Sequence, residues 1–177
     1  MISWLSRFRR DVSGLAAIEA ALLLPLLVLT SLGAIELAAA LDARRAVDNA
    51  SFSLVQSAAA SSVVDQGRRA RWVAGHDQSF NGVPGLSQVQ AELRSYINDG
   101  GTISRAWEWS PNGSGPGLSD SEAVQEVENQ IVPGEGILVA VVEARYRPII
   151  ASFVIGNMTF RSFHTQVPLK KTIPLDR

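Results

Sequence analysis

The longest apolar stretch of the chain runs from Gly14 to Leu41, and after Gly14 its only charged residues are Glu19 and Glu36. A helix rises about 1.5 Å per residue, so about 27 residues extend about 40 Å, enough to cross a bilayer core of about 30 Å. A buried helix of a soluble protein is rarely apolar on all sides over such a length. The pattern therefore predicts a membrane-spanning helix over residues 15–41.

Small apolar residues continue this pattern beyond Leu41 at spacings of three and four, which is typical of one helix face. They are Ala43, Ala46, Val47, Ala50, Leu54 and Ala58. We expect the helix to reach about Trp72, with fraying or a break around Gly67 or Gly75.

The remaining residues alternate between turn signals and short periodic segments. Ser87 is a suitable cap for a helix over 88–97, and residues 102–110 alternate as a strand with Ile103, Arg105, Trp107 and Trp109 on one side. A short helix is expected after a cap at Ser119 or Asp120. Apolar runs predict a central strand over 137–146 and a final strand over 158–169.

These elements predict an α+β fold in which a long N-terminal helix packs on a small antiparallel sheet of three to four strands. The pattern leaves the strand order open. It divides the chain into a leader over 1–14, a transmembrane helix over 15–41 and a head domain over 42–177.

Charge adds an orientation to this picture. The leader carries three arginines, Arg7, Arg9 and Arg10. A basic flank before the first membrane helix favours the cytoplasmic side, so the head is expected on the opposite side. The net charge is −1 and the basic residues are scattered. We therefore expect no nucleic-acid partner.

Candidate chemistry is sparse. The chain has no cysteine and only two histidines, His76 and His164, without the spacing of metal ligands. It contains neither a nucleophile-elbow pattern nor a phosphate-binding loop. We predict no enzymatic activity, no cofactor and no metal site.

Two residues inside the apolar stretch need explanation. A carboxylate well inside a membrane helix costs roughly 2.5–3.5 kcal/mol on insertion scales, so Glu19 is a candidate functional residue. Pro25 removes one backbone hydrogen bond and can kink or locally loosen the helix, which is tolerated in membranes.

A short basic leader, then a glycine, then an apolar helix with glutamate at its fifth position resembles a type IV prepilin. More narrowly, residues 7–50 resemble the TadE-like pseudopilins of the tight-adherence (Flp/Tad) pilus, with Ala20 where many members have phenylalanine. The residues that carry this pattern are Gly14, Ile18, Glu19, Ala20, Ala21, Leu22 and Pro25, with Glu36 as a second acid.

The resemblance implies a minor pseudopilin of the bacterial inner membrane, a single-pass protein with a cytoplasmic N-terminus and a periplasmic head. A prepilin peptidase would cut between Gly14 and Leu15, Glu19 would pair with a free N-terminus, and Glu36 would be a second intramembrane acid. The expected partners are this peptidase, other pilin and pseudopilin subunits, and inner-membrane lipids. The implied role is structural, in pilus assembly, surface adhesion and biofilm formation.

Two other interpretations fit the same residues. A signal peptidase could cleave after Ala40 and release a secreted protein, although Glu36 and the length of the apolar stretch argue against this. Alternatively, the helix is a plain anchor for a periplasmic binding or sensing domain.

Overall fold

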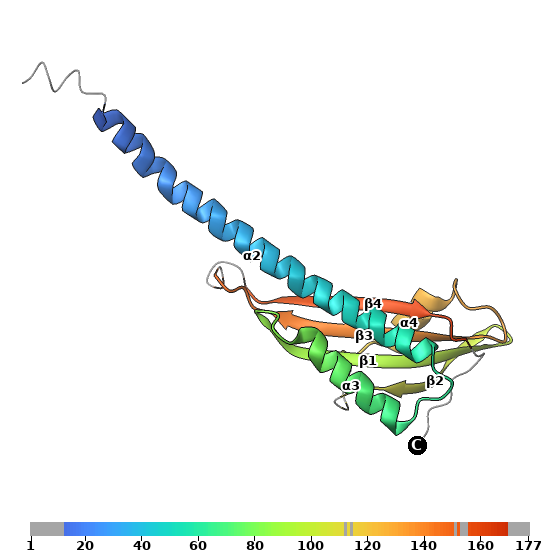
Figure 1. Cartoon of the computed structure of the whole chain (residues 1–177). Coiled ribbons are helices and arrows are strands. Elements are labelled where there is room, and N and C mark those ends of the chain that lie inside the picture. Colours follow the sequence, from blue (N-terminus) through green and yellow to red (C-terminus); the bar gives the residue numbers. More distant parts are fainter. Residues whose placement is uncertain (1–12, 112, 114, 151, 153–155, 170–177) are drawn as a thin grey trace, which may run out of the picture. The chain divides into compact units, whose positions relative to one another are not determined.

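The computed structural model describes residues 13–111, 113, 115–150, 152 and 156–169, so most of the predicted leader lies outside the described residues. The chain divides into two compact units between Ala38 and Ala39. The described helices are α2 (Ser13–Ala59), α3 (Gln66–Phe80) and α4 (Asp120–Val127), and the strands are β1 (Leu86–Asp99), β2 (Thr102–Trp109), β3 (Gly136–Tyr146) and β4 (Met158–Gln166) (Figure 1).

The four strands form one antiparallel sheet in the order β2-β1-β3-β4. The predicted α+β fold with a small antiparallel sheet is therefore confirmed. The strand expected to be central, β3, pairs on both sides and is buried over nearly its whole length. Its run of β-branched residues suits a position that is covered on both faces.

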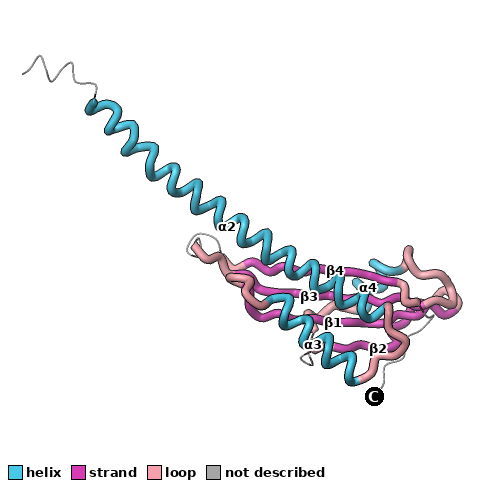
Figure 2. Tube along the Cα trace, viewed as in Figure 1, coloured by secondary structure: helices cyan, strands magenta, loops and turns pink. Residues whose placement is uncertain are grey.

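Each face of the sheet is covered by a separate apolar cluster. Figure 2 shows the strands of the sheet in magenta and the helices in cyan. On one face, the part of α2 after Ala38 and residues of α3 pack against Leu93, Leu138 and alternate residues of β3. On the other face, residues of α4 pack against Tyr96, Ile137 and Val139. The head is thus a helix–sheet–helix arrangement with two cores.

The first helix ends earlier than predicted. α2 stops at Ala59, and the break lies in residues 60–65 rather than at Gly67 or Gly75, which are both inside α3. Val64 is fully buried in the break, and the Asp65 side chain caps α3 by accepting a hydrogen bond from the Arg68 backbone N–H at 2.8 Å. A buried valine and an N-cap aspartate together fix the start of a second helix.

The helix predicted over 88–97 is wrong, because these residues form the greater part of β1. The strand pairs with both β2 and β3, and its residues 91–96 are buried on both faces. The apolar spacing that suggested one helix face is therefore divided between two faces, with Leu93 in one core and Tyr96 in the other. Strand pairing overrides the local helical preference here.

The strand predicted over 102–110 is present as β2, but the prediction that Ile103 shares a side with Trp107 and Trp109 is wrong. The register shifts at Ser95/Tyr96, whose partners are Trp107 and Arg105, so Ala106 is an extra residue in β2. Such a bulge reverses the alternation of side chains. Ile103 consequently packs in the α4-side core, whereas Trp107 and Trp109 pack in the other core.

Two glycines in the turn before β1 share the same backbone φ but differ in how closely other atoms approach them. Gly82 and Gly85 both have φ +79°, but a Cβ on Gly85 would lie 2.5 Å from the Arg147 carbonyl oxygen, whereas a Cβ on Gly82 would meet nothing within 4 Å. We expect Gly82→Ala to cost about 1 kcal/mol through backbone strain. Gly85→Ala should cost about 1–3 kcal/mol more through overpacking. Urea unfolding of the full-length protein in mild detergent measures both, and equal costs would contradict the close approach.

Candidate functional site

The part of α2 that precedes the head exposes apolar side chains on all sides. Residues 17–35 are all exposed, including Leu22 at 71% and Leu29 at 67%. At about 1.5 Å per residue they extend about 28 Å, close to the thickness of a bilayer core. Ala17–Ala59 is the one helix in the described part of the chain that is long and apolar enough to cross a membrane. α2 therefore has the properties of an N-terminal membrane anchor.

The two hydroxyl groups of this segment are satisfied within the helix itself. The hydroxyls of Thr30 and Ser31 both donate to the Leu27 carbonyl oxygen, at 3.0 and 2.8 Å. A helix also satisfies its own backbone groups, which is the requirement for a segment in lipid. The segment thus has no need of a protein partner for its hydroxyl groups.

The predicted motif residues lie along this helix rather than in one cluster. Gly14 is in the first turn of α2, Glu19 is exposed, and α2 continues through Pro25. About 25 Å of helix rise separates Glu19 from Glu36. The structure therefore does not bring the two acids together within one chain.

Glu36 differs from Glu19 in its surroundings. Its side chain is 6% exposed, whereas the neighbouring Ile35 and Leu37 are 56% and 62% exposed. Its position begins a spacing of three and four that continues through residues 40, 43 and 47, where the buried stripe of α2 lies. Glu36 is thus the one buried residue between positions 17 and 38.

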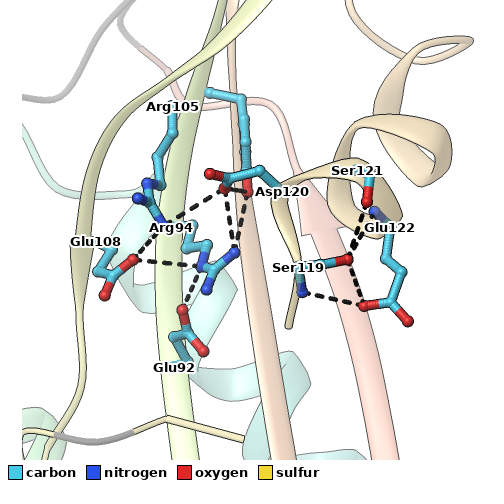
Figure 3. A network of polar contacts seen from close by, with 9 residues as sticks. Glu92, Arg94, Arg105, Glu108, Ser119, Asp120, Ser121 and Glu122 are labelled. Atoms are coloured by element: carbon cyan, nitrogen blue, oxygen red, sulfur yellow. Dashed lines mark hydrogen bonds and ion pairs between the residues drawn. The ribbon is translucent and has the colours of Figure 1, made fainter. Parts of the chain in front are cut away.

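The head contains a charged cluster that the sequence analysis did not identify (Figure 3). The Arg94 side chain is 7% exposed and pairs with Glu92, which is 3% exposed. Arg94 also donates to Asp120 at 3.2 Å and to the Tyr96 hydroxyl at 3.4 Å, and Tyr96 donates to Asp120 at 2.8 Å. Arg105 and Glu108 of β2 pair at the outer side of the same cluster.

The cluster attaches α4 to the sheet. Asp120 is the first residue of α4, and Ser119 caps the helix in a capping box with Glu122, which confirms the predicted start of this helix. Hydrogen bonds with Tyr96 and Glu92 outweigh burial and raise the pKa of Arg94. Burial raises the pKa of Tyr96 to about 12, so its hydroxyl remains a donor at neutral pH. The arrangement suits a structural role because its groups are paired with one another.

The sequence carried one signal for this cluster. Glu92, Arg94 and Tyr96 occupy every second position, as expected for one face of a strand. Interpreting residues 88–97 as a helix hid that alternation, and the contribution of Asp120 depends on tertiary contacts.

Ser162, Asp48 and His164 lie close together, as the three residue types of a catalytic triad do. Ser162 donates to Asp48 at 2.7 Å, and His164 Nε2 lies 4.0 Å from the same carboxylate oxygen. In a catalytic triad the histidine lies between the serine and the acid and accepts the serine proton. Here the serine proton goes to the acid, so this geometry gives no relay. The described residues contain no group of three or more side chains suited to a metal ion.

The comparisons with known proteins concern the N-terminal part of the chain. Residues 14–55 match the family model of TadE-like proteins. This match agrees with the resemblance that the glycine, glutamate and proline pattern indicated, and it covers that part of the chain alone. Searches of curated proteins and of solved structures give no match.

The contacts of the Arg94 cluster predict that replacing Arg94 destabilises the head much more than replacing Arg105. Arg94→Met should destabilise the head by about 3–5 kcal/mol, because it leaves the buried Glu92 carboxylate without its cation. Arg105→Met removes a half-exposed cation and should cost less than about 1 kcal/mol. Urea unfolding followed by tryptophan fluorescence measures both. Adding Glu92→Gln to Arg94→Met should recover part of the loss.

Equal stability of the two single variants would show that Arg94 is not the centre of the cluster.

Proposed function

From the match over residues 14–55, we propose that this chain is a minor pseudopilin of a tight-adherence type IV pilus. It would be a single-pass protein of the bacterial inner membrane with the leader in the cytoplasm and residues 42–177 as a periplasmic head. Its role would be structural, in pilus assembly and in the surface adhesion that the pilus provides. The observation that carries the proposal is an exposed apolar helix that contains the family motif.

Processing between Gly14 and Leu15 follows from the motif. Gly14 is exposed in the first turn of α2, and a Cβ added there would meet nothing within 4 Å among the described residues. Cleavage by a prepilin peptidase would create a new amine on Leu15. Glu19 would then lie about one helical turn further along.

Glu19 would serve the contact between subunits. It is the one charged residue among residues 17–35, and its side chain is exposed. An ammonium group brought next to this carboxylate would offset part of the desolvation of both groups. The amine of a neighbouring subunit fits this role, and Pro25 would loosen the helix as subunits leave the bilayer. Glu36 would be a second acid within the membrane-spanning segment.

The first test is the N-terminus of the protein isolated from its native cells, by intact mass and N-terminal sequencing. We expect a chain that begins at Leu15. A chain that begins at Leu41 would instead identify a secreted protein and remove Glu19 from its mature function. An intact Met1 would indicate an ordinary anchor and would contradict the processing step.

The second test is the requirement for Glu19. Glu19→Ala should abolish assembly while the head remains folded, because the change removes a charge from an exposed helix position far from the cores. Thr30→Ala is a matched control, since its hydroxyl bonds only to the carbonyl of Leu27 in the same helix. Immunoblotting of sheared pili reports assembly, and limited proteolysis reports folding of the head.

Assembly that survives Glu19→Ala would exclude the proposed pairing with an N-terminus.

A further inference from the structure

A cavity of about 250 Å³ lies between the head section of α2 and α3. Both helices cover the same face of the sheet (Figure 1). The walls of the cavity come from α2 between Ala50 and Ser57 and from α3 between Arg71 and His76. All of these residues belong to the compact unit that begins at Ala39, so the cavity is a feature of the head alone.

His76 contributes a buried polar group to this cavity. It is 8% exposed, and its ring packs edge-on against Phe80 with the ring centroids 5.0 Å apart. Within the described part of the chain, no group forms a hydrogen bond with the ring. Burial lowers the pKa of His76 although the nearby Asp77 carboxylate opposes this. The ring is therefore neutral at pH 7, with one nitrogen that donates and one that accepts.

The other polar groups of the cavity carry no charge into it. Ser53 and Ser57 donate their hydroxyls to carbonyl oxygens of their own helix, at 3.1 and 2.9 Å, so their oxygens remain as acceptors. Arg71 Nη1 lies 3.7 Å from the position that a Cβ on Gly67 would take. Its guanidinium group thus lies toward the first turn of α3, and the stem of Arg71 lines the cavity.

The remaining walls are apolar. Leu54 is buried, and the partly buried Trp72 packs edge-on against Trp109 with the ring centroids 5.6 Å apart. Gly75 leaves one wall without a side chain, and a Cβ built there would meet nothing within 4 Å. A cavity of about 150 Å³ is large enough to bind benzene. The cavity in the head therefore has room for an aromatic ring with a substituent.

We propose that this cavity binds a phenol group, with the aromatic ring against Trp72 and Leu54 and the hydroxyl on His76. A hydroxyl matches a neutral imidazole because both groups donate and accept, whereas a charged group would meet no opposite charge beside His76. The phenol can belong to a small molecule or to a tyrosine side chain of another protein. The inference goes beyond the proposed function, since it requires neither processing nor a pilus.

The test uses the full-length protein in mild detergent, purified without a histidine tag and dialysed against known free concentrations of p-cresol. The chain has two histidines, so carbon-13 NMR of the ring Cε1–H groups gives two signals, which His164→Gln assigns. We expect p-cresol to shift the His76 signal with a Kd on the order of 1 mM, as for a ligand of about eight non-hydrogen atoms. The His164 signal should stay in place.

Toluene tests the contribution of the hydroxyl. It has the same ring and methyl group as p-cresol, but it leaves the buried imidazole without a hydrogen bond. We expect it to bind about fivefold more weakly than p-cresol. Toluene that binds as tightly as p-cresol would overturn the assignment of the cavity to a phenol.

Two adjacent positions on α3 provide matched variants. Gly75→Leu places a side chain in the cavity and should abolish the shift of the His76 signal. Ala74→Leu adds a leucine at an exposed position that does not line the cavity, and it should change the Kd less than about twofold. Equal affinities of the two variants would overturn the site. The toluene titration uses the parent protein, so a folding defect in Gly75→Leu does not leave the proposal untested.

The tripeptide glycyl-tyrosyl-glycine distinguishes the two sources of the phenol. A His76 shift with both the tripeptide and p-cresol would support the site and assign it to a tyrosine side chain of another protein. A shift with p-cresol alone would support the site and assign it to a small molecule. No shift with p-cresol would overturn the inference, while the N-terminus of the native protein tests the proposed function independently.

Discussion

Close packing between one stripe of α2 and one face of the sheet is the interaction on which the head depends. The stripe consists largely of small residues, and Ala43, Ala50 and Ala58 are at most 3% exposed. Small side chains let the helix backbone approach the strands, so that the Ser51 hydroxyl reaches the Ala140 carbonyl of the central strand at 3.0 Å. A larger side chain in this stripe would separate the helix from every strand at once.

The opposite face of the sheet combines charged contacts with apolar ones. There the apolar contacts of α4 are accompanied by a buried arginine and glutamate that bond to the first residue of that helix. A buried ion pair adds little net stability compared with apolar residues of the same size, but a displaced partner is costly. This suggests that the Arg94 cluster selects the position of α4 and the register of β1 more than it stabilises the head.

One helix therefore serves two environments. Its first part is apolar apart from Glu19 and satisfies its own backbone and hydroxyl groups, as lipid requires. Its second part presents one stripe to a protein core. The proposed contact at Glu19 would act in the first part of this helix, between subunits.

Local sequence was sufficient for the features that depend on neighbours along the chain. The apolar stretch over 14–41, its family motif, the central strand and the cap at Ser119 are all encoded by composition and short-range spacing, so each could be predicted. The strand over 88–97, the bulge at Ala106 and the Arg94 cluster could not. Strand pairing and burial on two faces arise between segments far apart in the sequence, and these contacts override local preference.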